Sequence, residues 1–143
     1  MDENLNRARE ILINGGYTCV IIKDDIEYNS KERGVKPLLD WTEQDINFED
    51  AYVSDKVVGK AAAFLYVLMK VKAIYAIVLS QHAYEVLQRY GIAVSYDSIV
   101  PAIRNRDNTG FCPMESSVMG INDPAKAKER IEATRAELLK KGK

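Results

Sequence analysis

The first thirty residues change from a helical period of apolar positions to a strand-like one. Apolar residues recur at helical spacing over residues 5–12, and the Gly15-Gly16 pair that follows is typical of a left-handed helix end. Residues 17–23 are then rich in β-branched side chains. Asp24-Asp25 suits a turn, after which residues 26–29 can pair back. This pattern predicts a helix followed by a β-hairpin.

The middle of the chain is more uniformly apolar. A short helix is predicted around residues 37–42, because proline suits a first helical turn. Residues 57–69 carry apolar side chains on more than one face, which predicts a helix buried on several sides. The apolar run at 73–79 is typical of a central strand, and residues 92–96 predict a second strand parallel to it. The helix between these two strands would be capped by Ser80.

The regular pattern weakens between Asp97 and Asn122, where turn-forming residues cluster. A loop of this length tends to mark function. The pattern recovers with Asp123 as a helix cap and Pro124 at the first helical position, which predicts a C-terminal helix over about 123–140. With 143 residues, we expect one domain, residues 1–143.

Charge and cysteine content narrow the partners and the compartment. Twenty basic against twenty-one acidic residues give a net charge of −1, so no overall field attracts nucleic acid or anionic membrane. Cys19 and Cys112 lie far apart in different surroundings, which disfavours a disulfide scaffold. The N-terminus is acidic, and the longest apolar stretch, residues 61–71, is too short to span a bilayer. We expect a cytoplasmic protein that binds neither nucleic acid nor membrane.

Three segments of the chain resemble a bacterial family of uncharacterised proteins, a domain of unknown function placed in the cytidine-deaminase-like superfamily. They are SDKVVGKAAA (54–63), YGIAVSYDSIVPAIRNRD (90–107) and TGFCPMES (109–116). The resemblance extends from Gly16 to about Val118. It implies a three-layer α/β/α cytidine-deaminase-like fold with a mixed central sheet. The predicted order of helix, two strands, buried helix, strand, helix and strand is that of this fold. The family carries no assigned activity.

The residues of a zinc deaminase are missing from the corresponding positions. Such an enzyme places His or Cys, with Glu two residues later, at the start of the buried helix, and a P-C-x-x-C turn before the next helix. Here these regions are residues 55–60 and 79–83, and neither holds the motif. His82 is the single histidine of the chain. We therefore expect a metal-free protein without a cofactor.

Asp55, Lys56, Gly59 and Lys60 lie at the entrance of the predicted buried helix. Unpaired N–H groups at a helix N-terminus attract phosphate, and a lysine beside a glycine can reach the same anion. The segment lacks the first glycine and the hydroxyl residue of a P-loop. The alternative is a capping aspartate with solvated lysines.

Two further groups of residues lie in the region 97–122. If Pro113 opens a helix, Cys112 is its cap, where the helix dipole favours a nucleophilic thiolate. Glu115 in the same turn opposes that effect, so a half-buried cysteine in a packed turn remains the alternative. Arg104 and Arg106 are suited to bidentate phosphate contacts, or else they belong to a solvated loop.

The leading hypothesis is a metal-free deaminase-like protein that binds a nucleotide or an ADP-ribose-type ligand in the pocket of the fold. The anion would lie near Asp55, Lys56, Gly59 and Lys60. The residues expected to line the other side are Ser80, Arg106, Cys112 and Glu115.

Two alternatives belong to other classes of protein. One is a metal-independent enzyme in which the Cys112 thiolate or the Asp55 carboxylate is the nucleophile, with Glu115 as a third catalytic candidate. The other is an interaction module in which the 97–122 loop and the C-terminal helix form an oligomer contact. Because deaminase-like folds commonly self-associate, we expect a homo-oligomer.

Overall fold

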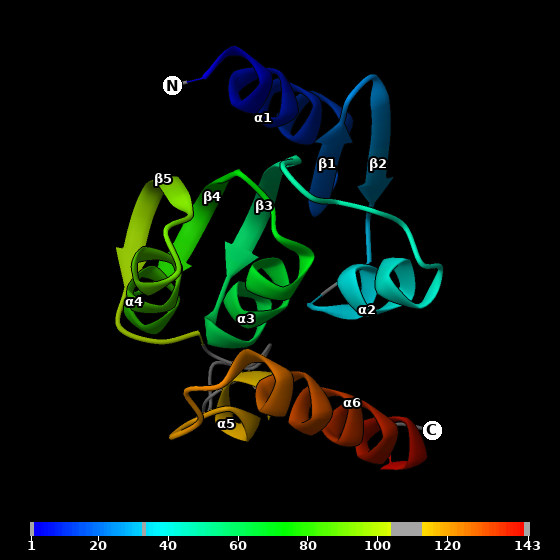
Figure 1. The fold of residues 1–143 in the computed structure, drawn as a ribbon, viewed down its shortest axis with the longest axis vertical. Helices are drawn as coiled ribbons and strands as arrows, with labels where there is room; N and C mark the ends of the chain where they lie inside the picture. Colours follow the sequence, from blue (N-terminus) through cyan, green and yellow to red (C-terminus); the bar gives the residue numbers. More distant parts are fainter. Residues whose placement is uncertain (1, 33, 104–112, 142–143) are drawn as a thin grey trace.

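The computed structural model describes residues 2–32, 34–103 and 113–141 (Figure 1). In chain order the elements of this part are α1 (Glu3–Gly15), β1 (Cys19–Lys23), β2 (Ile26–Ser30), α2 (Lys36–Glu43), β3 (Tyr52–Val58), α3 (Lys60–Met69), β4 (Ala73–Ser80), α4 (Gln81–Arg89), β5 (Ala93–Val100), α5 (Pro113–Ser117) and α6 (Pro124–Lys141). None of the helices in the described ranges has the length and apolar character needed to cross a membrane.

The strands form one mixed sheet in the order β2-β1-β3-β4-β5. The predicted hairpin is confirmed, because β1 and β2 are antiparallel and Asp24 has a positive φ of 55° in the turn between them. β1 is also antiparallel to β3. β3, β4 and β5 run parallel to one another, which confirms the predicted parallel pair.

Strand β3 is the main feature that the sequence pattern did not predict. The apolar pattern places residues 57 and 58 in the buried helix, and the alternative interpretation of the 55–60 segment makes Asp55 the helix cap. Both assignments are wrong, since Val57 and Val58 pair with β4 and α3 begins at Lys60 with Gly59 as its N-cap. The three consecutive polar residues 54–56 hide the strand pattern in the sequence. Ladder partners on both sides, β1 and β4, stabilise the strand despite this polarity.

Other element ends follow their local signals. Ser80 caps α4, its Oγ accepting the Ala83 N–H at 3.0 Å. Asp123 precedes α6 and its Oδ2 accepts the Lys126 N–H at 2.9 Å. Strand β5 extends to Val100, beyond the predicted end at residue 96. The region expected as a loop therefore begins inside a strand.

Helices lie on both faces of the sheet (Figure 1). On one face α1 buries Ala8 and Leu12 against Val20 and Ile22 of β1. The opposite face carries α3 and α4 and the main hydrophobic core. Helix α3 is buried along most of its length because α4, α5 and α6 all contact it, as the apolar pattern predicted. This burial brings the first turn of α3 into contact with residues far along the chain.

Candidate functional site

The N-terminus of α3 is occupied by a side chain from α5. Glu115 is 5% exposed, and its Oε2 accepts the backbone N–H of Ala61 at 2.9 Å. A Cβ added at Gly59 would overlap the Glu115 carboxylate, so glycine is the residue that allows this close approach. A carboxylate is favourable here because the helix dipole is positive at this end. One of the N–H groups expected to hold a phosphate is therefore satisfied from within the protein.

Lys60 begins α3 and is only 9% exposed. Its Nζ lies 5.7 Å from the centroid of the Phe64 ring, a cation–π distance. Burial lowers the pKa of Lys60, while the charge of Glu115 raises it. Within residues 2–32, 34–103 and 113–141, Lys60 makes no ion pair. The structure thus places a largely buried lysine residue near a buried carboxylate at the start of a helix.

Ser80 lies at the same edge of the sheet as Gly59 and Lys60. β3 ends one residue before Gly59, and β4 ends at Ser80, so α3 and α4 both begin where neighbouring parallel strands end. The Ser80 hydroxyl is fully buried and accepts the Ala83 N–H, which gives it a capping role. The fold therefore brings four of the predicted site residues to the carboxyl ends of β3 and β4: Gly59, Lys60, Ser80 and Glu115.

Asp55 belongs to a different environment from the one expected. It is 7% exposed on β3, where Tyr66 of α3 donates its hydroxyl to Oδ2 at 2.5 Å. The Val57 N–H lies 3.3 Å from Oδ1. Burial raises the pKa of Asp55 to about 7, against the lowering effect of the Tyr66 and backbone hydrogen bonds. Within the described residues, no hydrogen bond or ion pair connects Asp55 with Lys60.

Cys19 completes this buried polar cluster, which the sequence did not reveal. Its Sγ lies 3.3 Å from the Tyr66 hydroxyl oxygen, and it faces Asp55 in the antiparallel register of β1 and β3. Burial raises the pKa of the Cys19 thiol and of the Tyr66 hydroxyl well above their ordinary values. Only the strand register and the packing of α3 bring these three residues together, so no spacing in the sequence indicates them.

Of the remaining predicted site residues, the structure describes only Lys56, and it joins neither cluster. The side chain of Lys56 is exposed on β3, and its backbone N–H donates to the Thr18 carbonyl at 2.9 Å. Arg104, Arg106 and Cys112 lie outside the described residues. In the part of the chain that is described, no group of three or more His, Cys, Asp or Glu side chains is placed to hold a metal ion.

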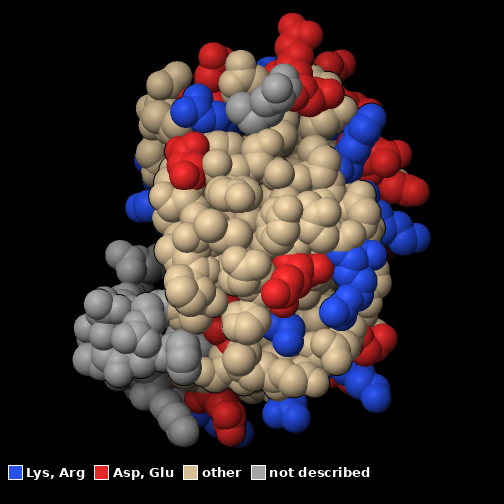
Figure 2. Space-filling view, turned by 90° about the vertical axis from the view of Figure 1, so that its left-hand side faces the viewer, with Lys and Arg blue, Asp and Glu red and all other residues tan. Residues whose placement is uncertain are grey.

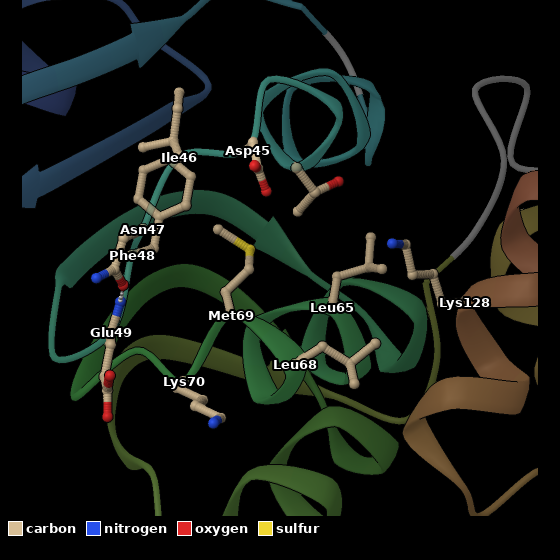
Figure 3. A pocket seen from close by; sticks show the side chains of 11 residues that line it. Asp45, Ile46, Asn47, Phe48, Glu49, Leu65, Leu68, Met69, Lys70 and Lys128 are labelled. Atoms are coloured by element: carbon tan, nitrogen blue, oxygen red, sulfur yellow. Dashed lines mark hydrogen bonds between the residues drawn. The ribbon is translucent and has the colours of Figure 1, made fainter.

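A groove of about 320 Å³ lies at the opposite end of α3 from Lys60 (Figure 3). Apolar side chains from α3 and from the segment after α2 form its floor, and charged side chains surround them. The lining residues are Thr42, Asp45, Ile46, Asn47, Phe48, Glu49, Leu65, Leu68, Met69, Lys70 and Lys128. None of the predicted site residues is among them. No sequence pattern indicates this groove, because its walls come from three separate segments of the chain.

Fold and site together define a class: a mixed α/β protein with a buried lysine and a buried glutamate at the start of its central helix. The chain belongs to the family described as TM1506, domain of unknown function (DUF1893), whose match covers residues 7–134. A crystal structure of a DUF1893 family protein (TM1506) from Thermotoga maritima is similar, with a TM-score of 0.83 and 31% identity. The similarity covers 96% of this chain and 92% of that one. No curated protein matches the chain.

Proposed function

We propose that this protein binds a nucleotide or an ADP-ribose-type ligand at the carboxyl ends of β3 and β4, where α3 and α4 begin. The observation that carries the proposal is the Lys60 side chain, since the residue is only 9% exposed and makes no ion pair in the described ranges. A buried charge is costly unless an opposite charge and hydrogen bonds compensate it. The phosphate of a bound nucleotide supplies that compensation.

The position of Lys60 in the fold supports a ligand site. In open α/β sheets, ligands bind outside the carboxyl ends of the strands. β3 and β4 are parallel, and Gly59-Lys60 and Ser80 follow directly after their carboxyl ends. Lys56 is left out of the contact set, because Asp55 beside it on β3 faces α3 and successive strand residues point to opposite faces. Asp55 is left out of the contact set, because its carboxylate is turned to Tyr66.

With Glu115 at the start of α3, we propose a different mode of phosphate binding from the one expected from the sequence. Because its carboxylate already accepts the Ala61 N–H, the phosphate is bound by the Lys60 side chain rather than by the first turn of α3. A carboxylate beside a phosphate site can accept hydrogen bonds from ribose hydroxyl groups, as in dinucleotide-binding folds. We assign that role to Glu115, which favours a ribose-bearing ligand over inorganic phosphate.

We also propose that the chain has the cytidine-deaminase-like fold. Its support is the order of elements, in which a helix and a hairpin precede three parallel strands joined by helices. In zinc deaminases of this fold, the metal ligands begin the two helices that correspond to α3 and α4. The same location here carries Lys60 and Ser80 in place of those ligands. A site for a base and a phosphate at the start of α3 and α4 would thus lie where the zinc deaminases have their metal-containing pocket, but without the metal.

A thermal-shift comparison tests the nucleotide site. AMP, ADP, ADP-ribose and inorganic phosphate are each added to the wild type, to Lys60→Met and to Lys126→Met, which removes an exposed lysine of α6. A ligand at about 100 times its Kd stabilises the folded state by about 2.7 kcal/mol, a shift of several degrees in Tm. We expect this shift in the wild type and in Lys126→Met and its loss in Lys60→Met. Equal shifts in all three proteins, or no shift with any nucleotide, would refute the proposal.

The second candidate is a metal-independent enzyme in which Cys112, rather than Asp55, is the nucleophile. Asp55, with a pKa raised to about 7, is partly protonated at neutral pH, and a neutral carboxyl group is a poor nucleophile. Cys112 directly precedes Pro113 in the sequence, and because it lies outside the described residues, its candidacy depends on the helix-cap position that the sequence predicts. Rates of thiol alkylation against pH decide this case. A titration at about pH 8.5, the ordinary thiol value, would remove the argument for an activated cysteine.

A further inference from the structure

Strand β5 leaves one edge of the sheet open. It is the last strand in the sheet order, and among the described residues only β4 pairs with it. Most of its eight residues are exposed, and Tyr96 and Ile99 are 41% and 38% exposed. The strand sequence AVSYDSIV contains neither lysine nor proline, the residues that commonly protect sheet edges. Figure 2 faces this side of the molecule, and uncharged side chains cover a broad central part of it.

We propose that this edge pairs with β5 of a second copy of the chain, antiparallel and about a twofold axis at Tyr96. The two sheets then join into one continuous sheet. This long edge, on which Asp97 is the one charged residue, is a template for strand addition, because its outward N–H and C=O groups would gain partners. A second copy, rather than another protein, is the occupant because the side chains of β5 are complementary to themselves in this arrangement.

The complementarity follows from the pairing rules of an antiparallel twofold. A twofold axis perpendicular to the sheet keeps each face on its own side, so an axis at Tyr96 places Asp97 opposite Ser95 of the partner subunit. The Ser95 hydroxyl can donate to that carboxylate. On the same face, Ile99 lies opposite Ala93, an apolar pair. All residues from 93 to 99 find a partner in this register.

The structure places the relevant side chains on the correct faces. Asp97 accepts the Tyr75 hydroxyl at 2.5 Å, on the side of the sheet that α1 covers. Tyr96 points to the other side, where its ring meets Tyr84 of α4 at a centroid distance of 6.2 Å in a T-shaped contact. At the axis, the two Tyr96 rings would lie side by side and extend this aromatic contact across the interface.

Neighbouring registers are less favourable. An axis at Asp97 places two carboxylates directly opposite one another, and like charges in such a pair are destabilising. An axis at Ser98 pairs only residues 96–100 and leaves the first half of β5 open. The axis at Tyr96 is therefore the register with the longest overlap and no opposed like charges.

Two substitutions of opposite charge at Ser95 test both the pairing of the β5 edge and its register. Sedimentation equilibrium over micromolar to millimolar concentrations measures the Kd of the dimer for the wild type, Ser95→Asp and Ser95→Lys. The aspartate would face Asp97 of the partner subunit twice per dimer and raise the Kd about tenfold. The lysine would face the same carboxylate and leave the Kd unchanged or lower. A monomeric wild type at all concentrations, or an equal weakening by both substitutions, would overturn the proposal.

Cysteine cross-linking tests the register separately, in a Cys112→Ala background. Residues directly opposite in an antiparallel pair have Cα atoms about 4.5–5.5 Å apart, within disulfide range. Tyr96→Cys is therefore expected to form a covalent dimer on oxidation. The two copies of Ser98→Cys would lie about 13 Å apart and should remain monomeric on a non-reducing gel. The reverse pattern, with Ser98→Cys linked and Tyr96→Cys not, would refute the axis at Tyr96. Circular dichroism confirms that each variant is folded.

Discussion

Replacing Asp55 by asparagine should change how the stability of the protein depends on pH. The side chain keeps its size and can still accept the Tyr66 hydroxyl, but it no longer titrates. In the wild type, burial raises the pKa of Asp55 from the ordinary 3.8 to about 7. The folded state therefore binds more protons than the unfolded state between these two values. The free energy of unfolding must fall as the pH rises from about 4 to about 7.

The size of this effect follows from the shift. A difference of about three pKa units corresponds to roughly 4 kcal/mol between the acidic and the neutral limit. This contribution is fully present below the unfolded pKa and is lost as the pH rises through the folded pKa. Between about pH 5 and about pH 8, Asp55 alone should therefore cost the wild type roughly 2–3 kcal/mol.

Urea unfolding at these two pH values measures the effect. All other titrating groups are common to the wild type and Asp55→Asn, so the difference between their pH dependences isolates Asp55. Asp25→Asn, which replaces an exposed carboxylate in the β1–β2 turn, serves as the control and should behave as the wild type does. Parallel pH dependences for the wild type and Asp55→Asn would show that the buried carboxyl group does not titrate in this range, and the reasoning from burial would fail.

Three other substitutions test the local structure through urea unfolding. Gly59→Ala should destabilise by about 1–3 kcal/mol, since its Cβ displaces the buried Glu115 carboxylate from its hydrogen bond, and wild-type stability would show that the approach is not tight. Ser80→Ala should cost about 1 kcal/mol because the Ala83 N–H loses its cap, and unchanged stability would show that this cap does not stabilise α4. Ser54→Ala should stabilise by about 1 kcal/mol, as the buried Ser54 Oγ has no hydrogen-bond partner in the described structure, and a loss of stability would indicate that the hydroxyl is satisfied.

The candidate site was only partly predictable from the sequence. Gly59 and Lys60 were correctly placed at the start of a buried helix, because the apolar run after them has a clear helical period. Glu115 was a candidate through its neighbour Cys112. Its actual contact, with the N–H of Ala61 fifty-four positions earlier, had no signal in the sequence. The interpretation of Asp55 as a helix cap is wrong, because a short polar segment has the same sequence pattern at a helix N-terminus and in a strand.

The sequence alone determined the features that depend on neighbouring residues: the helix end at Gly16, the hairpin turn, the Ser80 cap and the start of α6 at Pro124. These arise from backbone preferences and hydrogen bonds over a few positions. The tertiary structure decided the rest. It placed β3 between β1 and β4, buried Asp55 against Tyr66 and closed the first turn of α3 with Glu115. Such contacts depend on strand order and helix packing across the whole chain, and no local period of apolar residues encodes them.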